Sequence, residues 1–567
     1  STLMRSSAAS DVYKRQHIFL AGILVMLLSS CSDFLDYNEN SDYDQNKLFN
    51  TTWSNTDFVT GIYAYLPGAL NDVDGALRSA ACDEAEYVWP TSTIHRFYDG
   101  SWSAIRTVDD KWGHYYKAIR ACNDYLENGT GKDWKEFEFK KDYAKMMRKY
   151  RNLEWEVKAL RAYYYFELVK RYNRIPLITK VLTEEEANNQ VPVDYQTIVD
   201  FIVRECDEVT EDGRLPAVYN ADYDNETGRV SKIFALALKA RTLLYAASPL
   251  NNPDAETNPA KWIETAKAAK KIIDAAGSWN LSLVSFDRLL GADNYKEPEM
   301  ILIKRIGDTN ELEKLNFPIG LEGGKSGNCP TQNLVDAYDM KEGQEMNESE
   351  PYANRDPRLA YTVLYHGGKT AYGKQVDVLP NGLNGLPQEG ATKTGYYLSK
   401  FVNISVSLTA NSTTTAKHSM PLFRYAEILL IYAEAMNEAY GPEGVTDELN
   451  LSARDAINMV RGRSGLGIAA LTSEDVSSKK EFRQALRKER MAELAFEDHR
   501  FWDIRRWKIG EETTKIKRVS ISKAGDKYSF EYSVTADRIW DDKMYFYPIP
   551  QSEIYKNPKL VQNPGWK

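Results

Sequence analysis

Several patterns that would indicate a metal centre, a redox site or a nucleic-acid binder are missing from this 567-residue sequence. Its cysteines, Cys31, Cys82, Cys122, Cys206 and Cys329, form no CxxC pair, so neither a zinc ribbon nor a redox motif is present. The six histidines include no HExxH motif, and we expect no metal and no cofactor. The net charge is −9 and no block rich in Lys and Arg occurs, which sets nucleic-acid binding aside.

Motifs of a catalytic nucleophile are also missing. There is no GxSxG nucleophile elbow and no phosphate-cradling loop. Two carboxylates at a suitable separation could act as the acid and base of a glycosidase, and Asp83, Glu84 and Glu86 are the nearest candidates. Among 81 Asp and Glu residues such neighbours are inevitable, so solvated charge or packing support is the better interpretation. We predict that the chain is not an enzyme and keep a helical-fold glycoside hydrolase as an alternative.

The one marked apolar run lies near the N-terminus. Residues 18–28 read IFLAGILVMLL and follow Lys14 and Arg15. Eleven residues are too few to cross a bilayer as a helix, but they match the apolar part of a secretion signal. The run ends in LSSC, which resembles a lipobox, so we predict a signal peptide over 17–30 and an acylated Cys31.

The neighbourhood of this run adds two predictions. Residues 1–16 resemble translated adapter sequence and are interpreted as a non-native leader. Residue 32 is Ser and not the Asp that would retain a lipoprotein in the inner membrane. We therefore expect a lipidated linker over 31–50, polar and acidic, that anchors the protein in an outer membrane.

The body, residues 51–567, is predicted to be mainly all-α. Apolar residues recur at helical spacing in the windows 112–126, 155–169, 233–247 and 425–436, with further helices expected at about 260–275, 450–463 and 480–497. Large and small residues alternate on these stripes, which favours tetratricopeptide-like hairpins with few short strands, although no strict 34-residue repeat is present. Long loops at about 85–104, 305–330 and 366–420 are expected to carry function.

Two charged motifs and the internal cysteines have structural interpretations. Arg355, Asp356 and Arg358 in NRDPRL are expected to fix a turn through charge-assisted hydrogen bonds. A second set lies at helical spacing and predicts an ion-pair network that holds two helices: Arg490, Glu493, Glu497 and Arg500. The four internal cysteines could pair in an oxidising compartment, but free buried thiols are the better interpretation.

Seven motifs in a fixed order characterise the chain after its CSDFLD start. They are LRAYYYFELVKRYNRIPLI (160–178), GRVSKIFALALKARTLLYAASPLNN (228–252), PTQNLVDAYDM (330–340), NRDPRL (354–359), FRYAEILLIYAEAMNEA (423–439), ALRKERMAELAFEDHRFWDIRRW (485–507) and YPIPQSEIYKNPKLVQNPGW (547–566). Together they resemble the SusD/RagB family of outer-membrane nutrient-binding lipoproteins. The resemblance spans nearly the whole mature chain.

The resemblance implies a single SusD-like body with four tetratricopeptide-like hairpins beneath a loop-rich ligand face. It divides this body into an N-terminal SusD-like part at about 51–300 and a C-terminal RagB/SusD part at about 301–567. It implies a lipid-anchored protein on the cell exterior that captures oligosaccharides and delivers them to a SusC-like TonB-dependent transporter. Oligopeptides as cargo, and a periplasmic scaffold of tetratricopeptide type, stay open as alternatives.

Candidate ligand contacts come from two of the long loops. A sugar ring presents an apolar C–H face to aromatic rings and hydroxyls to polar side chains. The loop after Asp83 and the loop before PTQ correspond to the ligand-contacting loops of the proteins that the chain resembles, and the second loop has no Trp. The alternative is that these rings only pack loops onto the scaffold. The candidates are Tyr87, Trp89, His95, Phe97, Tyr98, Asn316 and Phe317, with Trp89 the foremost.

Overall fold

The computed structural model describes residues 48–68 and 71–566. The predicted signal peptide, Cys31 and most of the linker lie outside this range. The chain divides into two compact units, 1–58 and 59–567. Helix α3 (Thr52–Tyr63) begins in the first unit. No helix in the described range combines the length and apolar character needed to cross a membrane.

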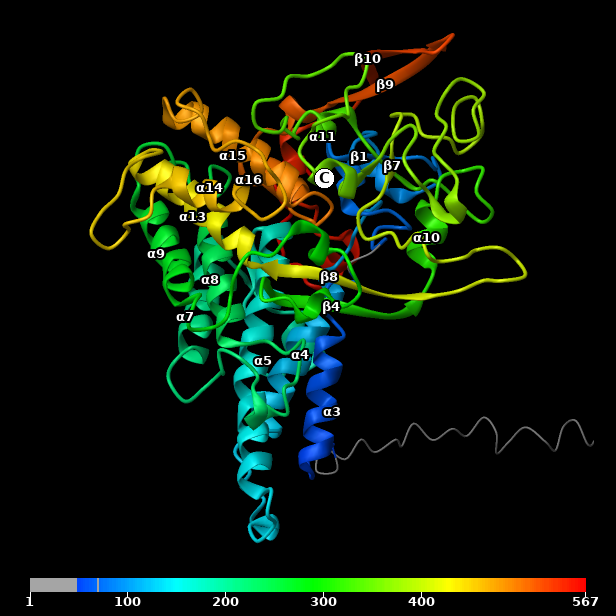
Figure 1. Ribbon diagram of the computed structural model, residues 1–567. Helices are drawn as coiled ribbons and strands as arrows, with labels where there is room; N and C mark the ends of the chain where they lie inside the picture. The colour runs from blue at the N-terminus through cyan, green and yellow to red at the C-terminus, as the bar shows by residue number, and fades with distance from the viewer. Residues whose placement is uncertain (1–47, 69–70, 567) are drawn as a thin grey trace, which may run out of the picture. The chain divides into compact units, whose positions relative to one another are not determined.

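A series of antiparallel helices forms the scaffold of the unit 59–567, and the prediction of a mainly helical fold is confirmed, with 41% helix and 12% strand. Along the series each helix packs on the next as far as α14, and α15 packs on α13 (Figure 1). The helices are α4 (Trp112–Asn128), α5 (Tyr143–Tyr172), α7 (Tyr195–Val209), α8 (Lys232–Ala247), α9 (Ala260–Ala275), α13 (Tyr425–Tyr440), α14 (Ala453–Arg461) and α15 (Lys479–Glu493).

Capping side chains and small residues explain where these helices begin and how closely they pack. The hydroxyl of Ser231 accepts a hydrogen bond from the Phe234 amide at the start of α8, and Ser478 does the same for Glu481 at the start of α15. Buried alanines such as Ala237 and Ala433 let neighbouring helices approach closely. The predicted boundaries of α8 and α9 agree with the structure within one residue.

Short elements connect and decorate the scaffold. The remaining α-helices are α6 (Glu184–Ala187), α10 (Glu311–Asn316), α11 (Gln332–Val335), α12 (Arg358–Thr362), α16 (Arg500–Arg506) and α17 (Gln551–Lys556). All sheets in the described range are two-stranded and antiparallel. They pair β1 (Ala85–Tyr87) with β5 (Asn328–Pro330), β2 (Ile175–Pro176) with β3 (Pro192–Val193), β4 (Met300–Thr309) with β8 (Ala416–Arg424), β6 (Val363–Leu364) with β7 (Tyr397–Leu398), and β9 (Lys515–Ala524) with β10 (Lys527–Asp537).

All three predicted loops are partly strand, and the first, 85–104, begins with β1. Residues 305–309 belong to β4, and residues 416–420 belong to its partner β8. Pairing across more than a hundred residues of sequence decides this, because an isolated strand has no partner to satisfy its backbone. The corrected loops are therefore shorter than the sequence predicted.

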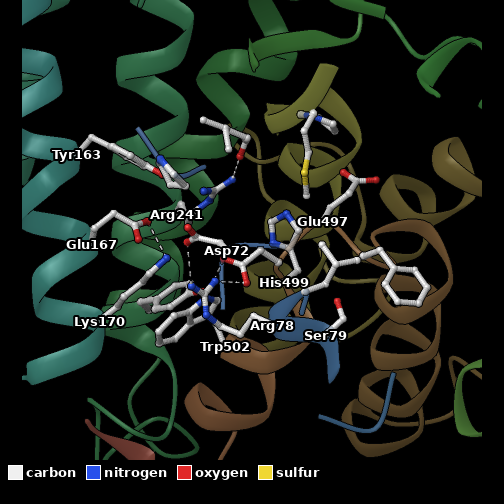
Figure 2. Close-up of a pocket in the computed structure, with 18 residues that line it drawn as sticks. Asp72, Arg78, Ser79, Tyr163, Glu167, Lys170, Arg241, Glu497, His499 and Trp502 are labelled. Carbon is white, nitrogen blue, oxygen red and sulfur yellow. Dashed lines mark hydrogen bonds and ion pairs between the residues drawn. The ribbon is translucent and has the colours of Figure 1, made fainter. Parts of the chain in front are cut away.

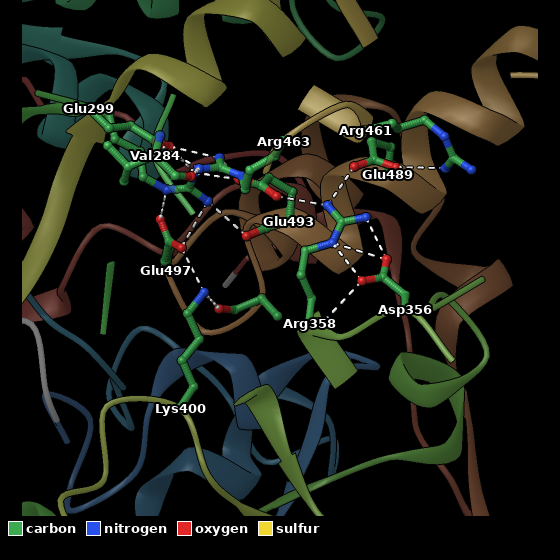
Figure 3. A network of polar contacts seen from close by, with 12 residues as sticks. Val284, Glu299, Asp356, Arg358, Lys400, Arg461, Arg463, Glu489, Glu493 and Glu497 are labelled. Carbon is green, nitrogen blue, oxygen red and sulfur yellow. Dashed lines mark hydrogen bonds and ion pairs between the residues drawn. The ribbon is translucent and has the colours of Figure 1, made fainter. Parts of the chain in front are cut away.

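A buried network of charged side chains joins β8 to the C-terminal helices (Figure 3). Arg424 donates to Glu299 at 2.8 Å and to Glu493 at 2.6 Å, and Arg463 donates to Glu493 at 2.6 Å. Burial opposes ionisation of Glu493, but Arg463, Arg424 and Arg358 outweigh it and hold the pKa of this carboxyl below its usual range. Charges taken this far from water persist only when opposite charges and hydrogen bonds surround them.

The predicted ion-pair network that holds two helices is confirmed in part, because one of its members pairs across to another helix, but the four residues do not all lie on one helix. Helix α15 ends at Glu493, so Glu497 and Arg500 lie beyond it. Arg490 pairs with Asp503 at 2.9 Å, and Arg500 reaches Asp83 at 2.8 Å, far along the chain. The turn after α15 directs Glu497 and Arg500 to other elements.

Two smaller predictions are confirmed. Arg358 forms a bidentate pair with Asp356, with hydrogen bonds of 3.0 and 2.7 Å, within the NRDPRL turn. All four internal cysteines are free and buried. Burial raises the pKa of the Cys329 thiol to about 12, as expected of an inert thiol in the core.

Candidate functional site

Strand pairing brings the two predicted ligand loops together. In the β1–β5 ladder Tyr87 lies opposite Asn328 and Ala85 opposite Pro330. The amide of Val88 continues the contact and donates to the carbonyl of Gly327 at 3.0 Å. The segment that begins at residue 85 therefore runs beside the segment before PTQ.

Trp89 lies where three loops meet. Its indole nitrogen donates to the carbonyl of Lys325 at 2.6 Å, and the side chain is half-buried on a cluster that includes Val376. Gly390, in the loop 384–392, has a φ of +78°, and a Cβ there would lie 3.0 Å from the indole ring. Only glycine adopts this backbone readily and lets the ring lie so close. The indole is thus fixed at its nitrogen and partly open to solvent.

His95 and Tyr98 stabilise the backbone of Trp89. The Nε2 atom of His95 lies 2.8 Å from the carbonyl oxygen of Trp89, and the Tyr98 hydroxyl lies 2.7 Å from Nδ1. Because the carbonyl can only accept, Nε2 donates, and in a neutral ring Nδ1 then accepts from Tyr98. The guanidinium of Arg538 stacks 3.9 Å from the Tyr98 ring centre. Both side chains are partly exposed beside Trp89.

Four of the seven candidate residues are buried and serve the fold. Phe97 packs edge-on against Trp102 at 4.8 Å between ring centres. Asn316 accepts from the Asn328 side chain at 2.8 Å and so ties the end of α10 to β5 within the second loop. The remaining two, Tyr87 and Phe317, are also buried. Ligand contact by these four stays a prediction, whereas Trp89, His95 and Tyr98 have surface that a ligand could reach.

The candidate carboxylates have structural partners. Both oxygens of Asp83 accept from Arg500 at 2.8 Å. Glu86 pairs with Arg538 at 2.5 Å. Glu84 is buried, and burial raises its pKa to about 8, with Ser79 opposing the shift by a hydrogen bond. In the described range no cluster of His, Cys, Asp and Glu could hold a metal ion.

A second polar region is enclosed and small (Figure 2). This cavity of about 60 Å³ is lined by the paired charges of Arg78 and Lys170 and by the ring of His499. Burial lowers the pKa of Lys170 to about 8, although Glu167 opposes this from 2.7 Å. Ligand pockets usually measure about 300–1,000 Å³, so this cavity does not have the size of a saccharide site.

An aromatic groove beside the β9–β10 hairpin was not predicted from the sequence. It measures about 630 Å³ and is lined by rings that include Tyr352, Tyr365, His366, Tyr528 and Phe530. A signal was present, because residues 527–534 read KYSFEYSV and alternate polar with apolar side chains. That pattern predicts a strand with one ring-covered face, which a search for helices overlooks.

Comparisons with known proteins agree with this architecture. A family model described as the SusD family matches residues 305–566. The chain is 24% identical to SusD-like protein P38 of Formosa agariphila over 423 residues, which make up 72% of this chain and 73% of that protein. The chain is also similar to two solved Bacteroides fragilis structures. One, a SusD-like protein, has 26% identity and a TM-score of 0.75 over 92% of this chain and 98% of that chain. The other, a SusD-like carbohydrate binding protein, has 24% identity and a TM-score of 0.72 over 91% and 100%.

Family model, relative and fold therefore agree, and they confirm the resemblance that the seven motifs indicated. The proteins of this family bind ligands and are non-catalytic, in agreement with the interpretation of Asp83, Glu84 and Glu86 as structural residues. Residues 305–566 match the SusD family, and the chain is SusD-like in fold over 92% of its length.

Proposed function

We propose that this protein captures oligosaccharides at the cell surface and delivers them to a SusC-like TonB-dependent transporter. The capture site is the junction of the loops 88–98, 317–327 and 384–392. The observation that carries the proposal is the half-exposed indole of Trp89, fixed by its hydrogen bond to Lys325 and by the close approach of Gly390.

A fixed aromatic ring suits a sugar. The ring offers a flat apolar surface to the C–H face of a pyranose, and its edge is already ordered, so little conformational entropy is lost on binding. His95 and Tyr98 lie beside it with polar atoms that suit hydroxyl groups. No covalent step is required, and moderate affinity allows release to the transporter.

Similarity to the SusD family supports the substrate class. One solved protein of the same fold is described as carbohydrate binding. Proteins of one fold can have different functions, so the residues of the site must support the substrate class. The predicted acylation of Cys31 and the linker 31–50 complete the proposal, because anchoring raises the local concentration of the binding protein beside its transporter.

Titration calorimetry with a panel of oligosaccharides and a panel of oligopeptides tests this function. We expect binding of at least one oligosaccharide, weakened about tenfold or more by Trp89→Ala, because loss of a buried stacking ring removes more than 1 kcal/mol. Trp53→Ala, at a strongly exposed tryptophan, is the matched control and should bind like the wild type. Unchanged affinity in Trp89→Ala, or binding of peptides alone, would contradict the proposal.

The location has its own test in the native host. Cys31→Ala should release the protein from the membrane fraction, because the acylated thiol is its anchor. Proteinase added to intact cells should degrade the wild-type protein. Survival of the wild type under this treatment would favour the periplasmic scaffold instead.

A further inference from the structure

We propose that the ring-covered face of the β9–β10 hairpin forms a second carbohydrate-binding site, separate from Trp89, that takes an extended glycan chain. This inference rests on the proposed function, because it assigns a longer substrate to the same protein. The site, named here the hairpin trough, is formed by Tyr528, Phe530 and Tyr532 on β10 and by Tyr352, Tyr365 and His366 opposite them.

The face of the hairpin is packed along one strand and uncovered along the other. In the ladder Phe530 lies opposite Ile521 and Tyr532 opposite Val519. Ile521 is 4% exposed and Val519 only 2%, whereas Tyr532 is 48% exposed and Tyr528 36%. Packing of the hairpin on the body thus uses β9, and the rings of β10 stay available. Exposed aromatic side chains gathered in one place commonly mark a binding surface.

The opposite wall of the trough is rigid. Tyr352 and Tyr365 stack with ring centres 4.3 Å apart and an interplanar angle of 20°. The hydroxyl of Tyr352 donates to that of Tyr396 at 3.2 Å, which in turn donates to the Gln332 side chain. Phe530 meets Tyr352 edge-on at 5.8 Å. These contacts order the rings before any ligand arrives, which lowers the entropic cost of binding.

Two adjoining cavities give the trough its length. One measures about 630 Å³ and the other about 460 Å³, and both are lined by Pro351 and Tyr352. Each has the size of a typical ligand pocket. Side chains of one face repeat about every 6.8 Å along a strand, so Tyr528, Phe530 and Tyr532 form a row of rings. A row of this kind fits a repeating ligand better than a compact one.

The chemistry of the lining favours sugars. In the described range the hydroxyls of Tyr365 and Tyr528 have no hydrogen-bond partner, so both can meet a ligand. The carboxylates of Glu350 and Asp377 lie at the rim and can accept from sugar hydroxyls. Flat rings between polar rim groups match a pyranose, which has an apolar face and a belt of hydroxyls.

The trough and the Trp89 junction have a common boundary. Val376 belongs to the cluster on which Trp89 packs and also lines the larger cavity. A glycan long enough to contact both sites would bind the second as an intramolecular event, with a raised effective concentration. A short oligosaccharide at Trp89 would gain nothing from the trough.

A double variant, Tyr528→Thr with Tyr532→Thr, tests the trough in the full chain. Threonine keeps the strand propensity of these positions, so the hairpin should persist. By calorimetry with purified oligosaccharides of graded length, we expect affinity for the longest bound chain to fall about tenfold, because two stacking rings are lost. Affinity for the shortest bound chain should change less than about twofold.

The matched control is Ser529→Ala with Glu531→Ala, on the opposite face of the same strand, which should bind like the wild type. If the threonine variant keeps its affinity for long chains while Trp89→Ala loses it, the trough is refuted and the proposed function stands. If Trp89→Ala changes nothing, the proposed function fails independently of the trough. Loss of peptide binding, with glycan affinity unchanged, in the threonine variant would refute the sugar assignment.

Discussion

The charged side chains of the buried network are all paired and shielded from solvent, whereas several aromatic side chains of the loop face are partly exposed. Every labelled charged side chain in Figure 3 has an oppositely charged partner, and Arg358, Arg424 and Glu493 are shielded from solvent. At the loop face Trp89, Tyr528 and Tyr532 keep part of their surface uncovered. Paired buried charges stabilise one arrangement of the chain, whereas uncovered rings leave stacking surface for a ligand. The comparison separates residues that hold the fold from residues that bind.

The largest expected effect is on the network. Glu493→Ala would remove one buried carboxylate partner from each of Arg424, Arg463 and Arg358, and so leave an excess of buried positive charge. We expect the free energy of unfolding to fall by about 3–5 kcal/mol, measured by urea denaturation. Glu443→Ala removes an exposed partner of Arg454 and should cost less than about 1 kcal/mol. If both variants lost the same free energy of unfolding, the buried network would stabilise the fold no more than an exposed ion pair does.

A smaller effect on stability is expected at Gly390, where the backbone contacts the Trp89 ring. Gly390→Ala places a methyl group against Trp89 and a side chain at a φ of +78°. We expect about 1–2 kcal/mol of lost stability from the backbone strain, together with several-fold weaker oligosaccharide binding from displacement of the indole. Gly465→Ala has a similar φ of +87° and no neighbour within 4 Å, so it should lose stability alone. If the Gly390→Ala variant bound oligosaccharides as the wild type does, the loop 384–392 would not belong to the binding site.

A third expected effect concerns the pH dependence of stability. Burial raises the pKa of Glu84 to about 8, so the folded protein keeps a proton that the unfolded chain releases above about 4.5. This contribution is complete below that pH and is lost as the pH rises through 8. Glu84→Gln should therefore gain up to about 4 kcal/mol relative to wild type between pH 5 and 8.5, by urea denaturation at both values. Glu211→Gln, at an exposed position, should show no such gain, and a flat difference for Glu84→Gln would refute the assignment.

Local sequence predicted most of the helical scaffold and part of the site. The stripes at 233–247 and 260–275 became α8 and α9, because helical periodicity and caps are properties of short segments. The expected helix at 480–497 ended at Glu493, since tertiary pairing of Glu497 with Arg424 and Lys400 draws the chain away from the axis. Trp89 was identified from composition and context, but the rings of β10 were not, because their common face depends on the hairpin.

The sequence by itself determined the helical class, the family and the two loops that meet at β1 and β5. Hydrophobic periodicity, the order of the motifs and the residue types of short segments predict these properties, because each depends on local sequence. Only the tertiary structure decided that Phe97 and Asn316 are buried while Trp89 is half open, and that Tyr352 faces Phe530 across a trough. The exposure of a side chain, and the side chain that lies opposite it, depend on contacts between segments far apart in the chain. The free energy of such contacts belongs to pairs of segments, so no single stretch of residues determines it.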